Sequence, residues 1–122
     1  MAITEYFEYT KKKGKYLSDI NPGSDEIALD ANEALKAIEL LKNNKIPILG
    51  GDILSTKSGK LIYAYQLWGS EYHCLNWFSD KLEEENQADY VVRSYENAKE
   101  AINKAIEISQ KMAKDCFIVL TI

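Results

Sequence analysis

Hydrophobic residues recur at helical spacing in three stretches of the chain. Residues 3–13 show this period and are followed by Gly14, a common stop signal. Asp30 has the residue type of a helix N-cap, and the apolar stripe after it predicts a helix over residues 31–43. A longer stripe predicts a third helix from about residue 89 to 112. Its members are Val91, Tyr95, Ala98, Ile102, Ala105, Ser109 and Met112.

Between the second and third helices the pattern becomes that of strands. Ser58-Gly59 is typical of a two-residue hairpin turn, and Gly69-Ser70 indicates a second turn. We therefore expect an antiparallel meander of three strands. Its strands are expected at residues 46–55, where Gly50-Gly51-Asp52 interrupts the apolar run, at 61–68 and at 72–78.

The remaining segments complete a small α+β fold. The turn residues Asn21–Ser24 precede a short segment, residues 26–29, which is predicted to be either extended or helical. Residues 116–122 are an unbroken apolar run, typical of a strand covered on both faces. We predict one domain over residues 1–122, with a small, mainly antiparallel sheet (the meander plus the C-terminal strand) covered by two or three helices.

The charge balance argues against nucleic acid as a partner. The chain has 15 Lys and Arg against 19 Asp and Glu, a net charge of −4, whereas nucleic-acid binding requires a basic face. An acidic protein is better suited to a basic partner. The sequence has neither a membrane-spanning apolar run nor a secretory signal at its start, so we expect a cytoplasmic protein that does not bind membranes.

The cysteine and histidine content predicts no metal site and no cofactor. Cys74 and Cys116 lie far apart in apolar, strand-like contexts, and His73 is the single histidine. Two buried, reduced thiols are the preferred interpretation of the cysteines, with one disulfide as the alternative. Zinc sites require clustered Cys and His ligands, which are absent here.

No catalytic constellation is visible. Gly50-Gly51-Asp52 lacks the third glycine and the following helix of a dinucleotide-binding site. The preferred interpretation of this motif is therefore a bulge or kink in a strand. Neighbouring residues on a strand point to opposite faces, which prevents His73 and Cys74 from forming a dyad. We therefore predict a protein that is not an enzyme. The alternative is a small hydrolase or ligand-binding protein with a pocket around Asp52, His73 and Cys74.

Aromatic residues gather on the predicted meander, next to an acidic segment. The chain has eight Tyr, two Trp and three Phe, and six of these 13 aromatics lie between Tyr63 and Phe78. Residues 80–89 follow and are rich in acid. Tyr and Trp anchor many protein interfaces because they bury a large area and keep a polar tip. Core packing is the competing interpretation for each of these aromatics taken singly.

Several segments resemble the immunity protein 40 family when they are taken in order. They are Ile46-Pro47-Ile48-Leu49-Gly50-Gly51-Asp52-Ile53-Leu54, then Asn76-Trp77-Phe78, then Tyr90-Val91-Val92-Arg93-Ser94. The resemblance covers roughly residues 25 to 113, and Asp52, Trp77, Arg93 and Ser94 match family positions. The family has Tyr where this chain has Phe78.

The resemblance implies a small bacterial protein that binds and neutralises the cognate toxin domain of a polymorphic toxin system. Such a protein is an inhibitor, and its partner is a protein. We expect the contact surface to combine the aromatics of the meander with the acidic segment, because opposite charge speeds association with a basic toxin. A structural subunit with an obligate partner is a further alternative, and the oligomeric state stays open. The expected partner-binding residues are Asp52, Tyr65, Trp68, Tyr72, Trp77, Asp80, Glu83 and Glu84.

Overall fold

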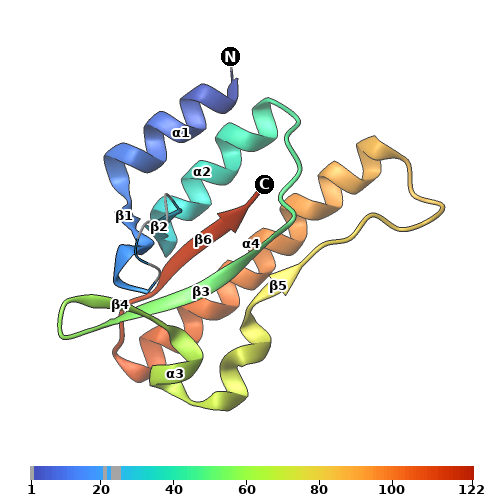
Figure 1. Cartoon of the computed structure of the whole chain (residues 1–122). Helices are drawn as coiled ribbons and strands as arrows, with labels where there is room; N and C mark the ends of the chain where they lie inside the picture. Colours follow the sequence, from blue (N-terminus) through green and yellow to red (C-terminus); the bar gives the residue numbers. More distant parts are fainter. Residues whose placement is uncertain (1, 21, 23–25) are drawn as a thin grey trace.

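A computed structural model describes residues 2–20, 22 and 26–122, and its strands form an open antiparallel sheet. The strand order is β1-β2-β6-β3-β4, and β5 also pairs with β3 (Figure 1). The C-terminal strand β6 lies between β2 and β3, which confirms the prediction of a central strand. The strands are β1 (Lys15–Tyr16), β2 (Ile27–Asp30), β3 (Gly50–Lys57), β4 (Lys60–Tyr63), β5 (Trp77–Phe78) and β6 (Phe117–Thr121).

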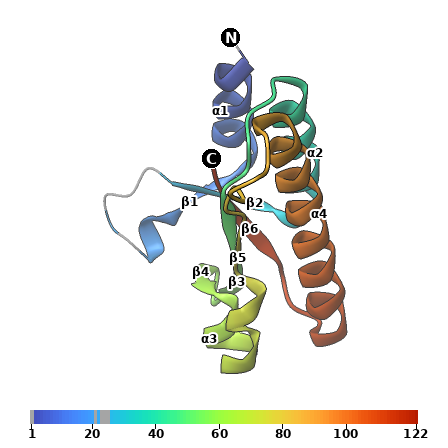
Figure 2. The ribbon, with the colours of Figure 1, turned by 90° about the vertical axis from the view of Figure 1, so that its right-hand side faces the viewer.

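Two long helices cover one face of this sheet. Figure 2 shows α2 and α4 side by side on the same side of the sheet, with α1 beside α2. The predicted α+β class and its helical cover are therefore confirmed. The helices are α1 (Ala2–Lys13), α2 (Ala31–Asn43), α3 (Ala64–Trp68) and α4 (Gln87–Met112), together with the 3₁₀ helices η1 (Leu17–Asp19) and η2 (Ser70–Leu75).

Both α2 and α4 begin after a capping side chain; Asp30 was predicted as a cap, whereas α4 begins at Gln87, two residues before its predicted start, after the cap Asn86. The Asp30 carboxylate accepts a hydrogen bond from the Asn32 backbone N–H at 2.9 Å, and the Asn86 side chain accepts one from Asp89 N–H at 2.8 Å. Each bond satisfies a donor that the first turn of a helix leaves without a partner. Helix α4 ends at Ala113, which has a left-handed backbone conformation.

The main hydrophobic core lies between the sheet and the helices. The predicted stripe of α4 faces this core, where Ala98, Ile102 and Ala105 are fully buried against Ile38 of α2 and Ile118 of β6. A second, smaller cluster on the other face of the sheet is covered by η1. It consists of Leu17, Ala28, Leu54, Leu61 and Val119. Among the helices of the described residues, none combines the length and apolarity that crossing a membrane requires.

The predicted first strand is wrong at its start. Residues 46–49 are irregular, and the strand β3 begins at Gly50, so the two glycines belong to the strand and do not interrupt it. Pro47 has no N–H to donate, and the Ile48 N–H donates instead to the Ser94 hydroxyl on α4 at 3.1 Å. A tertiary hydrogen bond has therefore replaced part of the strand pairing.

The predicted meander is also wrong beyond its first hairpin. The Ser58-Gly59 turn is present, with both residues at positive φ, but β4 ends at Tyr63 and the chain continues as the short helix α3. Ala64 and Trp68, four residues apart, are buried together by this helix. The third predicted strand is reduced to the two residues of β5, after the 3₁₀ helix η2.

The structure also bears on the predictions for the cysteines and for residues 21–29. Cys116 is buried as expected, whereas Cys74 is exposed because it lies on η2 instead of a strand, and both thiols are free. Of residues 26–29, for which extended and helical structure were both open, residues 27–29 are extended and belong to β2. The turn predicted at Asn21–Ser24 lies outside the described residues except for Pro22.

Candidate functional site

The eight expected partner-binding residues occupy three different environments. Trp68 is 8% exposed and belongs to the core, and the half-buried Tyr72 and Trp77 pack against that core. Tyr65 and Asp52 are half-buried on the face of the sheet opposite α4. The remaining three lie on an exposed segment before α4; they are Asp80, Glu83 and Glu84. The structure thus separates the aromatics, which the sequence places together.

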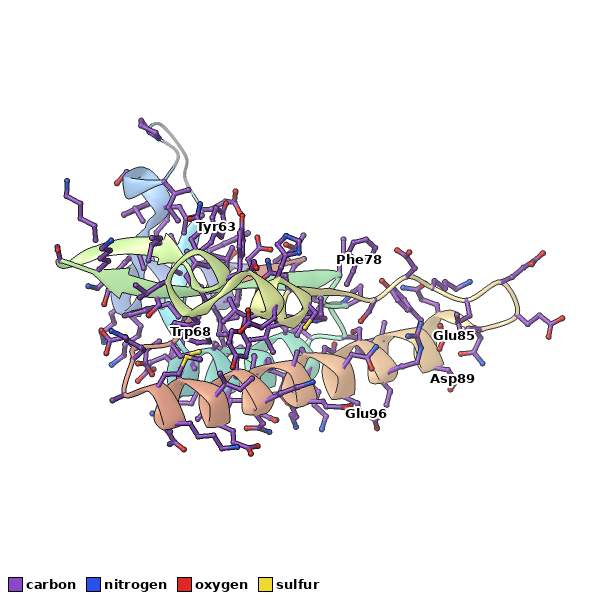
Figure 3. All side chains as sticks on the ribbon, turned by 90° about the horizontal axis from the view of Figure 1, so that it is seen from below. Tyr63, Trp68, Phe78, Glu85, Asp89 and Glu96 are labelled. Atoms are coloured by element: carbon purple, nitrogen blue, oxygen red, sulfur yellow. The ribbon has the colours of Figure 1, made fainter. Side chains whose placement is uncertain are left out.

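Strand pairing identifies the residues on the sheet face opposite α4, which we call the open face. Val119 pairs with Asp52, Leu54 with Tyr63, and Gly50 with Phe78. Directly paired residues share a face, and positions two apart along β3 do so as well. Figure 3 shows Tyr63 and Phe78 on the side of the sheet away from α4, whereas Trp68 points toward α4.

Three rings form an aromatic row on the open face: Tyr63, Tyr65 and His73. The Tyr63 and Tyr65 rings stack with their centroids 5.8 Å apart, and the His73 ring meets Tyr65 edge-on at 4.6 Å. The row therefore connects β4, α3 and η2. Phe78, which is 74% exposed, lies further along the same face. Together these rings make an apolar surface that solvent reaches.

Asp52 lies beside the aromatic row in an environment that disfavours its charge. Burial raises the pKa of its carboxyl, while attraction to His73 opposes this shift. Among the described residues no donor makes a hydrogen bond to this carboxylate, and no cation pairs with it. The neighbouring Tyr63 also has a raised pKa, first from burial and then from the Asp52 charge. Asp52 is therefore a partly desolvated carboxylate that makes no hydrogen bond or salt bridge with a described residue, and its attraction to His73 only partly offsets the effect of burial.

The exposed acidic segment, residues 79–86, is held firmly at both ends; we call it the acidic arm. At its start the Ser79 carbonyl accepts from the Tyr90 hydroxyl at 2.7 Å, and the Ser79 hydroxyl accepts from Asn97 at 2.9 Å. At its end the Arg93 guanidinium makes two bonds of 2.8 Å to the Glu85 carboxylate and also donates to the Asp80 carbonyl. Such fork-like pairing fixes both distance and orientation.

The excess of negative charge is concentrated on the acidic arm and the first half of α4, and the charges in the rest of the chain balance. Residues 80–100 contain seven acidic and three basic side chains, which equals the net charge of −4. Glu83 and Glu84 are exposed on the acidic arm, and Asp89 is exposed in the first turn of α4 (Figure 3). A partner approaching this end meets a concentrated negative potential.

Three of the four residues that carried the family resemblance have internal structural roles. Trp77 packs its ring against Gly51, Arg93 anchors the acidic arm, and the buried Ser94 hydroxyl accepts from Ile48 N–H. Asp52 differs, since it supports no other described residue through a hydrogen bond. Sequence reasoning did not identify Tyr63, His73 and Phe78 as surface residues of this face. The Gly50-Gly51 pair was a usable signal, because paired glycines in a strand mark the close approach of another segment.

We expect the Glu85–Arg93 pair to give the protein a specific acid sensitivity. The hydrogen bond from Arg93 is the main cause that lowers the pKa of Glu85 to about 2. Unfolded Glu titrates near pH ~4.3, so the pair stabilises the folded state above that pH and its contribution disappears as the pH falls toward 2. Urea unfolding should show Glu85→Gln less stable than wild type at pH 7, with the two proteins converging near pH 2.

The exposed Glu83 provides the control for this measurement. Glu83→Gln removes the same charge from the same arm without removing a described contact, and it should unfold like wild type across the pH series. A stability difference for Glu85→Gln that stayed constant from pH 7 to pH 2 would contradict the assigned ion pair.

The three residues of the alternative pocket do not line a common hollow, although Asp52 and His73 are close enough to attract each other on the open face. Cys74 lines a hollow of about 250 Å³ between η2, β5 and α4, on the side of the sheet away from the aromatic row. A larger hollow of about 560 Å³ lies between α1, β2 and β6. Neither hollow is lined by Asp52 or His73. The described residues also contain no group of three or more His, Cys, Asp or Glu that would hold a metal ion.

Comparison with known proteins confirms the expected family. The family model for Immunity protein 40 matches residues 16–122. No curated protein and no solved structure matches the chain. Since the family match includes every strand from β2 onward, together with the open face and the acidic arm, the chain belongs to the Immunity protein 40 family.

Proposed function

We propose that this protein is a non-catalytic immunity protein, which binds the cognate toxin domain of a bacterial polymorphic toxin system and neutralises it in the cytoplasm. Family membership supports an immunity role. The contact surface that we propose consists of the acidic arm and the open face. Trp68 is left out because it is buried in the core, and Trp77 because it packs against Gly51.

The observation that carries this proposal is the continuity between the two parts of the surface. Phe78 pairs with Gly50 on the open face, and the acidic arm begins at the next residue. An exposed aromatic residue thus lies between the aromatic row and the charges of Asp80, Glu83 and Glu84. Interfaces commonly combine aromatic anchors with a polar, charged rim. The bonds from Arg93, Tyr90 and Asn97 hold the arm in place before binding, which limits the entropy lost on association.

The function is tested by co-expression with a candidate toxin domain encoded beside this gene. We expect the immunity protein to restore growth and to co-purify with the toxin domain as a stable complex. Growth arrest that persists despite soluble expression of both proteins, with no complex on size-exclusion chromatography, would refute the pairing.

The charges of the acidic arm should control the rate of complex formation. We expect Glu83→Lys/Glu84→Lys to slow association with a basic toxin domain about tenfold at low ionic strength, because the double reversal removes the attraction that steers encounter. Association should also depend less steeply on salt. Stopped-flow or surface-plasmon measurements over a range of salt concentrations give both quantities.

A second double variant tests whether the association rate depends on the position of the reversed charges or only on the net charge of the protein. Glu5 and Glu8 lie on α1, away from the arm, and Glu5→Lys/Glu8→Lys changes the net charge by the same amount. This control should associate nearly as fast as wild type. Equal slowing in both variants would assign the effect to net charge, and unchanged rates in the first would remove Glu83 and Glu84 from the interface.

A further inference from the structure

The carboxylate of Asp52 differs from the other half-buried carboxylates of the described residues. These are Glu33, which accepts from the Tyr9 hydroxyl and pairs with Lys36, and Glu85, which pairs with Arg93. Asp52 makes no hydrogen bond or salt bridge with a described residue, and attraction to the exposed His73 only partly offsets its burial. A partly desolvated charge without a partner destabilises the folded state, and burial accordingly raises the pKa of this carboxyl. The free protein therefore keeps an unfavourable group at the middle of the open face.

Aromatic rings stand next to this carboxylate on the same face. Tyr63 pairs with Leu54, two positions along β3 from Asp52, which makes Tyr63 the diagonal neighbour of Asp52. Tyr65 continues the row through its stacked contact with Tyr63. Phe78 lies in the opposite direction along β3, through its pairing with Gly50. Asp52 is thus placed between a pair of tyrosine rings and an exposed phenylalanine.

A carboxylate with aromatic neighbours matches the chemistry of one basic side chain. An arginine or lysine gains a charge-assisted hydrogen bond from the carboxylate and a cation–π contact from a ring. The same face already contains such a contact, because the Lys15 ammonium lies 5.4 Å from the centroid of the Phe117 ring. Neither of the two hollows described above includes Asp52, whose half-buried carboxylate lies on a sheet face beside exposed residues. A group presented by a larger partner suits such a surface better than a small free ligand.

We propose that Asp52, with Tyr63 and Tyr65, forms a receptor site on the open face for a single arginine or lysine side chain of a protein partner. This inference rests on the proposed function, in which that partner is the toxin domain. It adds the chemistry of the central contact: the basic side chain binds beside Asp52 and neutralises its charge. The acidic arm accelerates encounter, whereas the Asp52 site slows dissociation.

The site can be tested without a toxin by using blocked amino acids as probes. N-acetyl-arginine methylamide and N-acetyl-lysine methylamide carry the proposed group, and N-acetyl-norleucine methylamide is the uncharged control. In ¹H–¹⁵N NMR titrations we expect saturable shifts of the Asp52, Tyr63 and Tyr65 amides with the two basic probes. The norleucine probe should leave these amides unchanged. Equal shifts with all three probes, or shifts confined to the acidic arm, would overturn the site.

Matched variants identify which groups are responsible. Asp52→Asn keeps the shape of the side chain and removes its charge, and it should weaken binding of the arginine probe at least tenfold. Glu5→Gln, which removes a charge from α1 outside the proposed contact surface, should leave binding of this probe unchanged. Tyr65→Phe keeps the ring and should bind like wild type, but Tyr65→Leu should bind more weakly. Asp52→Asn should also be at least as stable as wild type in urea at pH 7, because it removes a desolvated charge. Undiminished binding of the arginine probe by Asp52→Asn would refute the role of the carboxylate.

Measurements with the toxin domain separate this inference from the proposed function. If wild type neutralises the toxin and Asp52→Asn dissociates from it at least tenfold faster, both are supported. If wild type neutralises the toxin, Asp52→Asn dissociates at the wild-type rate and the basic probes do not bind, the function stands and the site is refuted. If the basic probes bind at Asp52 but no complex with the toxin forms, the site stands and the function is refuted.

Discussion

Replacing Gly51 with alanine should destabilise the protein by about 3 kcal/mol. A methyl group at this position would lie 2.3 Å from Cη2 of Trp77 and 2.8 Å from the Val119 carbonyl oxygen on the neighbouring strand. Both distances are far shorter than van der Waals contact, so either the indole ring or the strand pairing must move. Equilibrium urea unfolding measures the loss in the free energy of unfolding.

The double variant Gly51→Ala/Trp77→Leu tests the cause of this destabilisation. Leucine at position 77 removes the ring atoms nearest the new methyl group, so the alanine should cost clearly less in this background than in wild type. Gly59→Ala is the matched control, because a methyl group there meets no atom within 4 Å and only its positive φ of 79° costs energy, about 1 kcal/mol. An equal cost of Gly51→Ala in both backgrounds would exclude Trp77 as its source.

Removing the Ser94 hydroxyl should cost about 2 kcal/mol, because it leaves a buried backbone donor without a partner. The hydroxyl accepts from Ile48 N–H at 3.1 Å and donates to the Val91 carbonyl at 2.7 Å, and both Ser94 and Ile48 are fully inaccessible to solvent. In Ser94→Ala the Ile48 N–H can reach neither water nor another acceptor without local opening. Urea unfolding gives the energy, and amide hydrogen exchange at Ile48 should become faster relative to the amides of β3.

Ser109 is a suitable control on the same helix. It is also buried, but its hydroxyl donates to the Ile106 carbonyl within α4, and among the described residues no backbone N–H donates to it. Ser109→Ala should therefore lose clearly less stability than Ser94→Ala. Similar losses in the two variants would show that cavity formation, and not the unsatisfied Ile48 donor, dominates the effect.

These two positions connect the core to the proposed binding surface. Gly51 allows Trp77 to pack closely, and this contact places Phe78 on the open face at the start of the acidic arm. Ser94 attaches residues 46–49 to α4, and the Leu49 carbonyl in that segment accepts from Ser79 N–H at 2.8 Å. Both variants should therefore weaken toxin binding indirectly, although neither residue is part of the proposed contact surface.

Much of the fold could be predicted because its signals are local. The apolar stripe of α4 from Val91 to Met112 repeats over about six turns, and Asp30 provides a cap for α2 that needs no distant residue. The unbroken apolar run of β6 predicts a central strand, since only a strand covered on both faces tolerates such a run. The Ser58-Gly59 turn depends on two residues alone. In each case the energy that selects the structure comes from neighbours along the chain.

Segments whose structure depends on distant contacts were predicted less well. Residues 61–68 fit a strand by composition, but placing Ala64 and Trp68 together in the core favours a turn of helix. Tertiary packing outweighs β propensity there, because burying an indole ring contributes more than the intrinsic preferences of a few residues. The aromatic cluster of the sequence was consequently divided between the core and the open face.

The sequence by itself determined the family, the α+β class, the three long helices, the central C-terminal strand and the acidic character of residues 80–89. Only the tertiary structure decided which aromatics reach solvent, how Arg93 anchors the acidic arm and that Asp52 makes no hydrogen bond or salt bridge with a described residue. The physical reason is the range of the interactions. Periodicity and capping act within a few residues, whereas burial, strand register and the pairing of charges depend on groups that only folding brings together.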